Sequence, residues 1–141
     1  MTKTVFFGAV AAAAVLASTG AYAAEGDTLR TVKQRGELIC GVNPGLVGFA
    51  APDANGNWSG FDISLCRAIA AAVVGDPNKV RFVPTTGQTR FTALSSGEVD
   101  VLARNSTWTF QRDTDLKLDF SGVNYYDGQG FMVPKNLGMT K

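Results

Sequence analysis

The sequence predicts an α/β fold in which a mostly parallel sheet is flanked by helices. Short apolar runs alternate along the chain with longer segments whose apolar residues recur at helical spacing. Each of the first three helical segments ends at a glycine, which terminates helices readily because it adopts left-handed backbone angles. Parallel strands need a long crossover, usually a helix, so this alternation favours βαβ units.

Eight elements are expected before residue 104. They are a helix at residues 28–35, a strand at 38–42, an apolar loop at 46–51, a hairpin at 53–58, a helix at 62–74, a strand at 80–84, a helix at 88–96 and a strand at 99–103. The strands are compact apolar runs, whereas the helix at 62–74 carries Leu65, Ile69 and Val73 on one stripe.

Local signals mark the ends of these elements. Asp27 or Thr28 is expected to cap the first helix and Asp62 the second, because a side-chain oxygen there accepts from an unpaired backbone N–H. Asn55-Gly56 is the strongest short signal for a hairpin in the chain.

Beyond residue 104 the pattern is less regular. Thr109 can cap a short helical turn, which would place Arg112 at its third position. Apolar residues alternate over residues 116–120, and residues 123–126 and 130–133 are expected to be extended around a glycine-rich bend.

The first 23 residues are expected to be a secretory signal outside the fold. Lys3 gives a basic start, and residues 5–16 form an apolar run too short to span a bilayer comfortably. Ala21 and Ala23 supply small residues at the two positions that a signal peptidase reads. Residues 24–141 would then be exported, and we expect them in a bacterial periplasm.

The charge of the chain argues against some classes of partner. It has 13 Lys and Arg against 12 Asp and Glu, and no His, so nothing favours binding to nucleic acid or anionic lipid. A hydrophobic content of 45% suits a globular domain better than a disordered chain.

Two cysteines fall on different predicted elements. Cys40 lies on a strand and Cys66 on a helix. In an oxidising compartment such a pair tends to form a disulfide. The alternative is two buried free thiols that pack as small hydrophobic side chains, and the sequence leaves both open. Neither cysteine is expected to be catalytic, since the chain has no His to activate a thiolate and no CxxC motif.

The polar end of the strand at 99–103 is the strongest candidate for a ligand site. Ligands of open α/β sheets bind outside the carboxyl ends of the strands. A group of hydrogen-bonding residues follows this strand: Asn105, Ser106, Thr107, Thr109 and Arg112.

Three segments share the order and spacing of motifs found in one protein family. They are Gly60-Phe61-Asp62-Ile63-Ser64-Leu65 with the small apolar residues 68–70, then residues 90–100, and then residues 104–112 with Asp119-Phe120 and residues 125–128. Together they resemble the family 3 solute-binding proteins of bacterial ABC transporters, and specifically the general L-amino-acid-binding branch. Ser64 departs from the family pattern, which has an acid there that does not contact ligand. The resemblance implies a periplasmic-binding-protein-like (type II) lobe.

The resemblance also implies a set of ligand-binding residues. Members of the family bind an L-amino acid between two lobes. The arginine that forks onto the α-carboxylate corresponds to Arg112, and a guanidinium matches a carboxylate with two parallel hydrogen bonds. A helix start beneath it would add N–H donors. Thr107 corresponds to a Ser or Thr on the same carboxylate. Arg104, through its carbonyl, and Asn105 correspond to groups that receive the ammonium. Without the resemblance, Arg112 would be interpreted as a solvated surface cation.

Two aromatic residues are candidates for the wall of the cleft. Phe49 lies where family members supply such a wall, although ordinary core packing is the alternative. Trp108 stands between two polar residues, so a wall of the cleft and a plug beneath it are equally open. We name no catalytic residue, cofactor or metal site.

The function implied is the periplasmic binding component of an ABC transporter for L-amino acids, working as a monomer with an inner-membrane permease. Two alternatives share the fold: a secreted cyclohexadienyl dehydratase-like enzyme and a sensory ligand-binding lobe. An enzyme would need an acid or base over its substrate, and no His or clustered carboxylate pair precedes Arg112.

The resemblance implies that residues 24–141 are the first segment of lobe one, without lobe two. Family members are more than twice as long, and residues 130–133 resemble the first strand that crosses between the lobes. The acid that pairs with the ligand ammonium would come from lobe two. One charged contact contributes about 1.5–3 kcal/mol, whereas micromolar binding needs about 8 kcal/mol. We therefore expect this chain alone to bind amino acids weakly or not at all.

Overall fold

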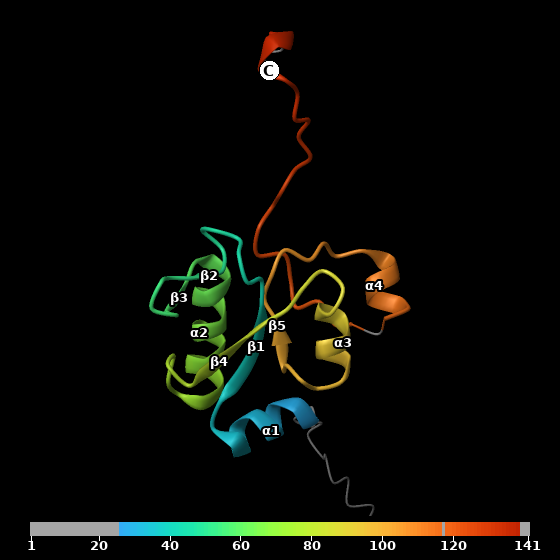
Figure 1. The fold of residues 1–141 in the computed structure, drawn as a ribbon. Helices are drawn as coiled ribbons and strands as arrows, with labels where there is room; N and C mark the ends of the chain where they lie inside the picture. Colours follow the sequence, from blue (N-terminus) through green and yellow to red (C-terminus); the bar gives the residue numbers. More distant parts are fainter. Residues whose placement is uncertain (1–25, 117, 139–141) are drawn as a thin grey trace, which may run out of the picture.

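The computed structural model describes residues 26–116 and 118–138, so the expected signal at residues 1–23 lies outside the described residues. The helices are α1 (Asp27–Arg35), α2 (Phe61–Val74), α3 (Arg90–Ser95) and α4 (Phe110–Thr114), with a 3-10 turn η1 (Lys135–Leu137). The strands are β1 (Leu38–Val42), β2 (Ala51–Pro52), β3 (Trp58–Ser59), β4 (Val80–Pro84) and β5 (Val101–Leu102). This order confirms the expected α/β alternation (Figure 1).

Three strands form a parallel sheet in the order β4-β1-β5. β1 pairs with β4 along its whole length, whereas β5 pairs through only Val101 and Leu102. The carboxyl ends of the three strands meet at one edge, called here the carboxyl edge, with α4 and the β2–β3 hairpin beside it (Figure 1). The hairpin turns around Asn55-Gly56, as the sequence predicts.

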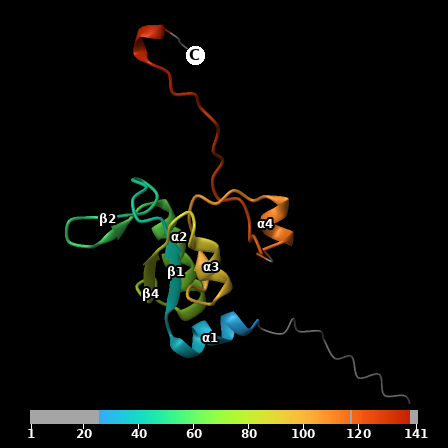
Figure 2. The same ribbon diagram turned by 45° about the vertical axis from the view of Figure 1, so that its right-hand side comes forward.

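Helices cover both faces of the sheet (Figures 1 and 2). On one face, Ile63 and Cys66 of α2 pack in a cluster with alternate residues of β1. On the other face, Ala93 of α3 packs with Ile39 and Val99. All five residues of β1 are buried as a result, which explains why this strand is a continuous apolar run rather than an alternating one.

The two cysteines form a disulfide. Cys40 on β1 and Cys66 on α2 are both fully buried, and their Cα atoms lie 6.2 Å apart. Of the two arrangements that the sequence left open, the structure therefore has the bonded one. The bond fastens α2 directly to the central strand, and so helps to fix the position of the carboxyl edge.

The predictions that Asp27 or Thr28 caps the first helix and that Asp62 caps the second are wrong. Gly26 and Gly60 are the N-caps of α1 and α2, and neither helix start has a side-chain cap hydrogen bond. Asp27 lies within the first turn of α1, where it pairs with Arg30. Asp62 lies within the first turn of α2 and is buried.

Two elements before the site are shorter than expected. The helix expected at residues 88–96 begins only at Arg90, because Thr86 and Thr89 exchange side-chain-to-backbone hydrogen bonds that hold the preceding residues as a turn. The strand expected at residues 99–103 is reduced to two residues. At the expected start of the strand, the carboxylate of Asp100 accepts from the backbone N–H of Ile39 at 2.7 Å, in the place of a backbone carbonyl.

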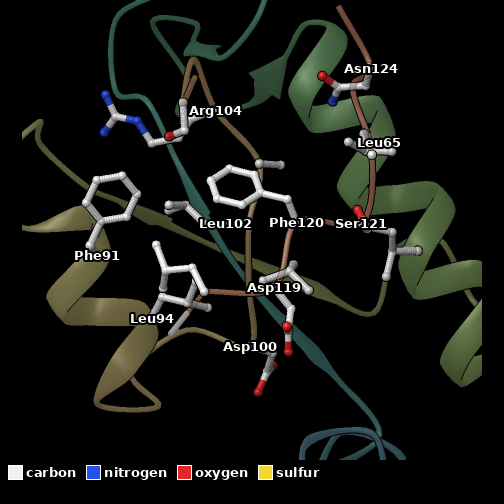
Figure 3. Close-up of a pocket in the computed structure, with 16 residues that line it drawn as sticks. Leu65, Phe91, Leu94, Asp100, Leu102, Arg104, Asp119, Phe120, Ser121 and Asn124 are labelled. Carbon is white, nitrogen blue, oxygen red and sulfur yellow. The ribbon is translucent and has the colours of Figure 1, made fainter. Parts of the chain in front are cut away.

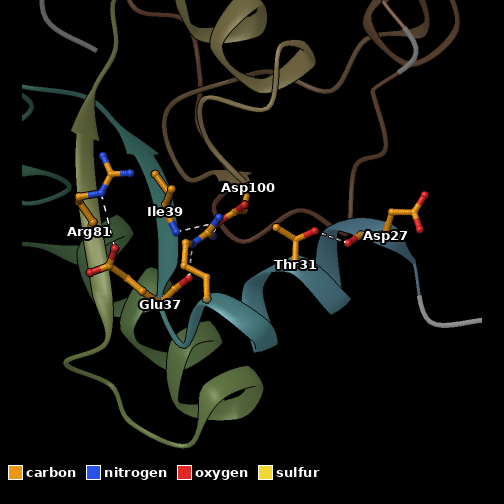
Figure 4. A network of polar contacts seen from close by, with 7 residues as sticks. Asp27, Thr31, Glu37, Ile39, Arg81 and Asp100 are labelled. Carbon is orange, nitrogen blue, oxygen red and sulfur yellow. Dashed lines mark hydrogen bonds and ion pairs between the residues drawn. The ribbon is translucent and has the colours of Figure 1, made fainter.

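Asp100 also joins α1 to the sheet at the edge away from the site (Figure 4). Its side chain is only 7% exposed and pairs with Arg35 of α1. Nε of Arg35 donates to the carbonyl of Glu37, and the Glu37 carboxylate lies 3.6 Å from Nε of Arg81 on β4. The network explains the acid that interrupts the apolar run, for which the sequence suggested no particular role.

Asp62 is an uncommon buried carboxylate. It is 3% exposed, and its Oδ2 has no hydrogen-bond partner among the described residues. Burial raises the pKa of Asp62, and the charge of Arg104 lowers it in part. Because the folded state then binds the proton more tightly than the unfolded state, this group favours folding at low pH. That contribution is lost as the pH rises through the folded pKa.

We therefore expect the difference in stability between Asp62→Asn and the wild type to shift in favour of the variant as the pH rises from about 4 to about 7. The amide keeps the shape of the side chain and carries no charge to desolvate. Thermal melts of both proteins across this pH range measure the difference in Tm. Asp76→Asn, at a residue outside the core, controls for the change in net charge, and a Tm difference that does not change with pH would contradict the interpretation.

Candidate functional site

Side chains after all three parallel strands join at the carboxyl edge. Nη1 of Arg104, after β5, donates to the carbonyl of Thr85, after β4, at 2.5 Å. Nδ2 of Asn43, after β1, donates to Oδ1 of Asn105 at 3.1 Å, and Nη2 of Arg104 donates to the same oxygen at 3.3 Å. The predicted residues Arg104 and Asn105 thus belong to one hydrogen-bonded group that spans the edge.

Arg112 is held close to the same edge. Thr109 caps α4 by accepting from the backbone N–H of Arg112, which confirms the predicted cap and the third position of the arginine. The side chain folds back so that Nη1 donates to the carbonyl of Thr107 at 2.6 Å. Its guanidinium carbon lies 5.2 Å from the centre of the Phe91 ring. Two of the predicted residues, Arg112 and Thr107, are therefore in contact, and the arginine is positioned rather than extended into solvent.

Arg90 also belongs to this hydrogen-bonded group, and the sequence did not indicate it as a candidate. Its Nη1 donates to the carbonyl of Asn105 at 3.2 Å, and its guanidinium carbon lies 4.6 Å from the Phe91 ring centre. Topology could have indicated it, because Arg90 begins α3, the helix that follows β4. The start of a helix that follows a parallel strand lies at the carboxyl end of that strand.

The three arginines at the edge, Arg90, Arg104 and Arg112, are named here the arginine cluster. Burial lowers the pKa of Arg90, and the charges of Arg104 and Arg112 lower it further. Burial also lowers the pKa of Arg104, which the charge of Asp62 partly restores. The cluster is thus a positively charged surface suited to a carboxylate ligand.

The two aromatic candidates lie in separate groups. Phe49 packs edge-to-face against Tyr125 and Phe61, with ring centres 4.9 and 6.1 Å away. Trp108 stacks on Phe120 with ring centres 5.4 Å apart, and it is 48% exposed. The structure therefore does not bring Phe49 and Trp108 together.

A cavity of about 250 Å³ runs along β5, between α2, α3 and the segment 118–124 (Figure 3). Arg104 and Phe91 lie toward one end and Asp100 at the other (Figure 3). Of the six predicted ligand-binding residues, Arg104 alone lines it. The other five predicted residues therefore do not enclose this cavity.

The described ranges contain neither a metal-binding cluster nor a membrane-spanning helix. Within residues 26–116 and 118–138, no group of three or more Cys, Asp or Glu side chains could hold a metal ion. No helix in that part of the chain is long and apolar enough to cross a membrane.

Residues 38–140 match the family of bacterial extracellular solute-binding proteins, family 3. The chain is 67% identical over 140 residues to the glutamate/glutamine/aspartate/asparagine-binding protein of Rhodobacter capsulatus. It is 58% identical over 137 residues to the general L-amino acid-binding periplasmic protein of Rhizobium johnstonii. These alignments cover 99% and 97% of this chain but only 40% of each relative.

Solved structures of ligand-binding proteins superpose on part of this chain. An ABC transporter periplasmic binding protein from Brucella ovis with glutathione bound superposes with a TM-score of 0.73 and 63% identity, over 75% of this chain and 33% of that one. The arginine-bound domain 1 of TmArgBP superposes with a TM-score of 0.53 and 30% identity, over 59% of this chain and 64% of that one. With its α/β order, parallel sheet and carboxyl-edge residues, the chain belongs to the bacterial extracellular solute-binding proteins of family 3.

Proposed function

We propose that the protein is the periplasmic substrate-binding component of an ABC transporter for L-amino acids. It captures the α-carboxylate and α-amino group in a cleft between two lobes, acts as a monomer and delivers the ligand to an inner-membrane permease. The names of the two curated relatives support the ligand class, and the signal-like residues 1–23 support export. The observation that carries the proposal is Arg112, fixed at the carboxyl edge beside Thr107.

Arg112 suits the capture of an α-carboxylate. One of its nitrogens is held by the Thr107 carbonyl, and no side-chain hydrogen bond among the described residues uses the others. A carboxylate could therefore accept two parallel bonds from the remaining N–H groups. The Thr107 side chain is exposed beside it and can donate its hydroxyl. Because α4 has only five residues, we assign its N-terminal backbone N–H groups no part in binding.

The ammonium end of the ligand would meet oxygens that already have protein partners. The Arg104 carbonyl accepts from the Ser106 N–H at 2.7 Å, and Oδ1 of Asn105 accepts from two side chains. A carbonyl oxygen has two lone pairs, so the Arg104 carbonyl retains room for one more donor. An acid outside the described residues would still be needed to neutralise a buried ammonium.

The described residues would supply only one side of the proposed cleft, since the chain covers 40% of each curated relative. We propose that residues 24–141 are the first segment of lobe one. Weak binding by this chain alone remains our prediction. The arginine-bound domain 1 of TmArgBP shows that, in that protein, one domain can hold its ligand. Isothermal titration of the 141-residue chain itself with L-amino acids tests this prediction, and micromolar binding would contradict it.

Isothermal titration of the product of the complete reading frame with a panel of L-amino acids tests the proposal. We expect micromolar or tighter binding of at least one L-amino acid, and binding at least about tenfold weaker for its α-amide, which cannot accept a charged bidentate contact. Binding of the α-amide as tight as that of the acid would contradict the carboxylate site. Turnover of prephenate or arogenate by the same product would favour the dehydratase alternative over a non-catalytic binding protein.

A further inference from the structure

Residues 118–126 are held against the core by their side chains rather than by their backbone. Among the described residues, no backbone hydrogen bond joins this segment to another part of the chain. Leu118 is buried, and Phe120 stacks on Trp108 with ring centres 5.4 Å apart. A further attachment is the ring of Tyr125. Apolar and aromatic side chains therefore set the position of this segment.

Tyr125 packs against two aromatic partners. Its ring centre lies 4.9 Å from that of Phe49 and 6.2 Å from that of Phe61, with interplanar angles of 89° and 61°. The Phe49 and Phe61 rings also contact each other, with centres 6.1 Å apart. Edge-to-face pairs of this kind stabilise a structure beyond the apolar area that they bury. The three residues, Phe49, Phe61 and Tyr125, are named here the aromatic triad.

The partners of Tyr125 stand on a fixed base. Phe61 is the first residue of α2, and its N–H donates to the carbonyl of Gly48 at 2.9 Å. The N–H of Asp62 donates to the carbonyl of Phe49 at the same distance. The disulfide in turn joins α2 to the central strand. The Phe49 and Phe61 rings therefore give Tyr125 a support that is fastened to the core.

Tyr125 makes the last ring contact along the described chain. Tyr126 is 88% exposed, and residues 127–138 are all exposed as well. In both ribbon views this part of the chain runs away from the sheet (Figures 1 and 2). Glycine restricts backbone angles least, so a bend forms more easily at Gly128 and Gly130 than within the attached segment. The chain thus leaves the core directly after Tyr125.

We propose that Tyr125 is a positioning residue: its packing against Phe49 and Phe61 fixes the point at which the chain leaves lobe one, and thereby limits the positions open to lobe two. This inference rests on the proposed function, in which a second lobe closes over the carboxyl edge. Without the Tyr125 ring, the chain would pivot from a point nearer Phe120, and the open protein would sample more arrangements. Binding would then have to order more of the chain, which lowers affinity.

Isothermal titration of the product of the complete reading frame measures the effect on binding. We expect Tyr125→Ala to weaken binding of the L-amino acid that the wild type binds most tightly by about three- to tenfold. Other L-amino acids of the panel should lose affinity by a similar factor, because the ring acts through the lobes and not on a particular side chain. Tyr125→Phe keeps the ring and should stay within about twofold of the wild type. Tyr126→Ala is the matched control, since Tyr126 is the exposed neighbour.

Small-angle X-ray scattering measures the effect on the arrangement of the lobes. Without ligand, Tyr125→Ala should have a larger radius of gyration than the wild type and Tyr126→Ala. With a saturating L-amino acid the three radii should converge, because the ligand selects the closed arrangement. A role confined to the stability of lobe one would leave these radii unchanged.

Equal radii of the ligand-free proteins would overturn the proposal, and so would a Tyr125→Ala variant that binds as tightly as the wild type. If the wild type binds no L-amino acid, the proposed function itself fails. The ligand-free radii would still decide whether Tyr125 positions the rest of the chain.

A double-mutant cycle tests whether Tyr125 acts through its ring contact. Phe61→Leu and Tyr125→Leu each keep an apolar side chain and remove one ring of the aromatic triad. We expect each variant to weaken binding, and the double variant to weaken it by clearly less than the product of the two factors, because both changes break the same contact. Losses that multiply would mean that the two rings act independently, and would contradict the proposal.

Discussion

Gly60→Ala is expected to destabilise the fold by about 3 kcal/mol or more. Gly60 has φ 122° and ψ 178°, a backbone conformation that essentially only glycine adopts. A Cβ built there would lie 2.3 Å from the carbonyl oxygen of Phe49, well inside any real contact. The obstacle is backbone, so a rotamer change cannot relieve it. A cost of this size is a large part of the typical 5–15 kcal/mol total of a domain.

The surrounding hydrogen bonds keep this contact from relaxing. The N–H groups of Phe61 and Asp62 donate to the carbonyls of Gly48 and Phe49, each at 2.9 Å. These bonds dock the start of α2 onto the loop that carries the predicted wall residue Phe49. Moving the two segments apart to admit a methyl group would break them, and would displace α2 and Phe49 together.

Urea denaturation of Gly60→Ala measures this cost, and Gly56→Ala is the matched control. Gly56 also has a positive φ, 82°, but a Cβ there would meet nothing within 4 Å. The control should therefore lose only the left-handed backbone cost of about 1–2 kcal/mol. Equal losses for the two variants would contradict the close approach of Phe49 to the start of α2.

Loss of the disulfide is expected to cost about 3.5 kcal/mol. The bond joins residues separated by 26 positions, and closing a loop of that length in the unfolded chain accounts for a stabilisation of this order in the chain-entropy treatment. Both cysteines are completely buried between β1 and α2, so Cys40→Ala/Cys66→Ala would also remove packing atoms from the core.

Urea denaturation of the double variant, beside wild-type protein with and without a reducing agent, checks the prediction. Reduced wild type retains the sulfur atoms and loses only the cross-link. It should therefore lie between the oxidised wild type and the double variant. If reduction leaves the denaturation midpoint unchanged, the stabilising role given to the bond is wrong.

Local patterns were sufficient to predict most of the scaffold. β1 and α2 were predicted closely because their burial produces a continuous apolar run and a helical stripe. The Thr109 cap was also predictable, since a cap depends on residues three positions apart. The length of β5 was overestimated because the Asp100 side chain accepts from the Ile39 N–H and pairs with Arg35. Both partners are distant in sequence, so local patterns do not show these contacts.

The candidate site was only partly predictable for the same reason. The resemblance marked Arg112, Thr107, Arg104 and Asn105, which follow one strand. Arg90 lies on α3 and Asp62 on α2. Only the arrangement of the strands in the sheet brings these helices close to the residues that follow β5. Asp62 was misassigned as a cap because an acid beside a helix start has two roles, and only its burial distinguishes them.

The affinity of Arg112→Gln for the amino acid that the wild-type protein binds most tightly tests the central claim most directly. We predict a loss of about ten- to a hundredfold, similar for every L-amino acid, because all of them share the α-carboxylate. Arg81→Gln should bind like the wild type, since Arg81 is 54% exposed and lies outside the site. An Arg112→Gln variant with unchanged affinity would remove Arg112 from the site and contradict the proposed mode of binding.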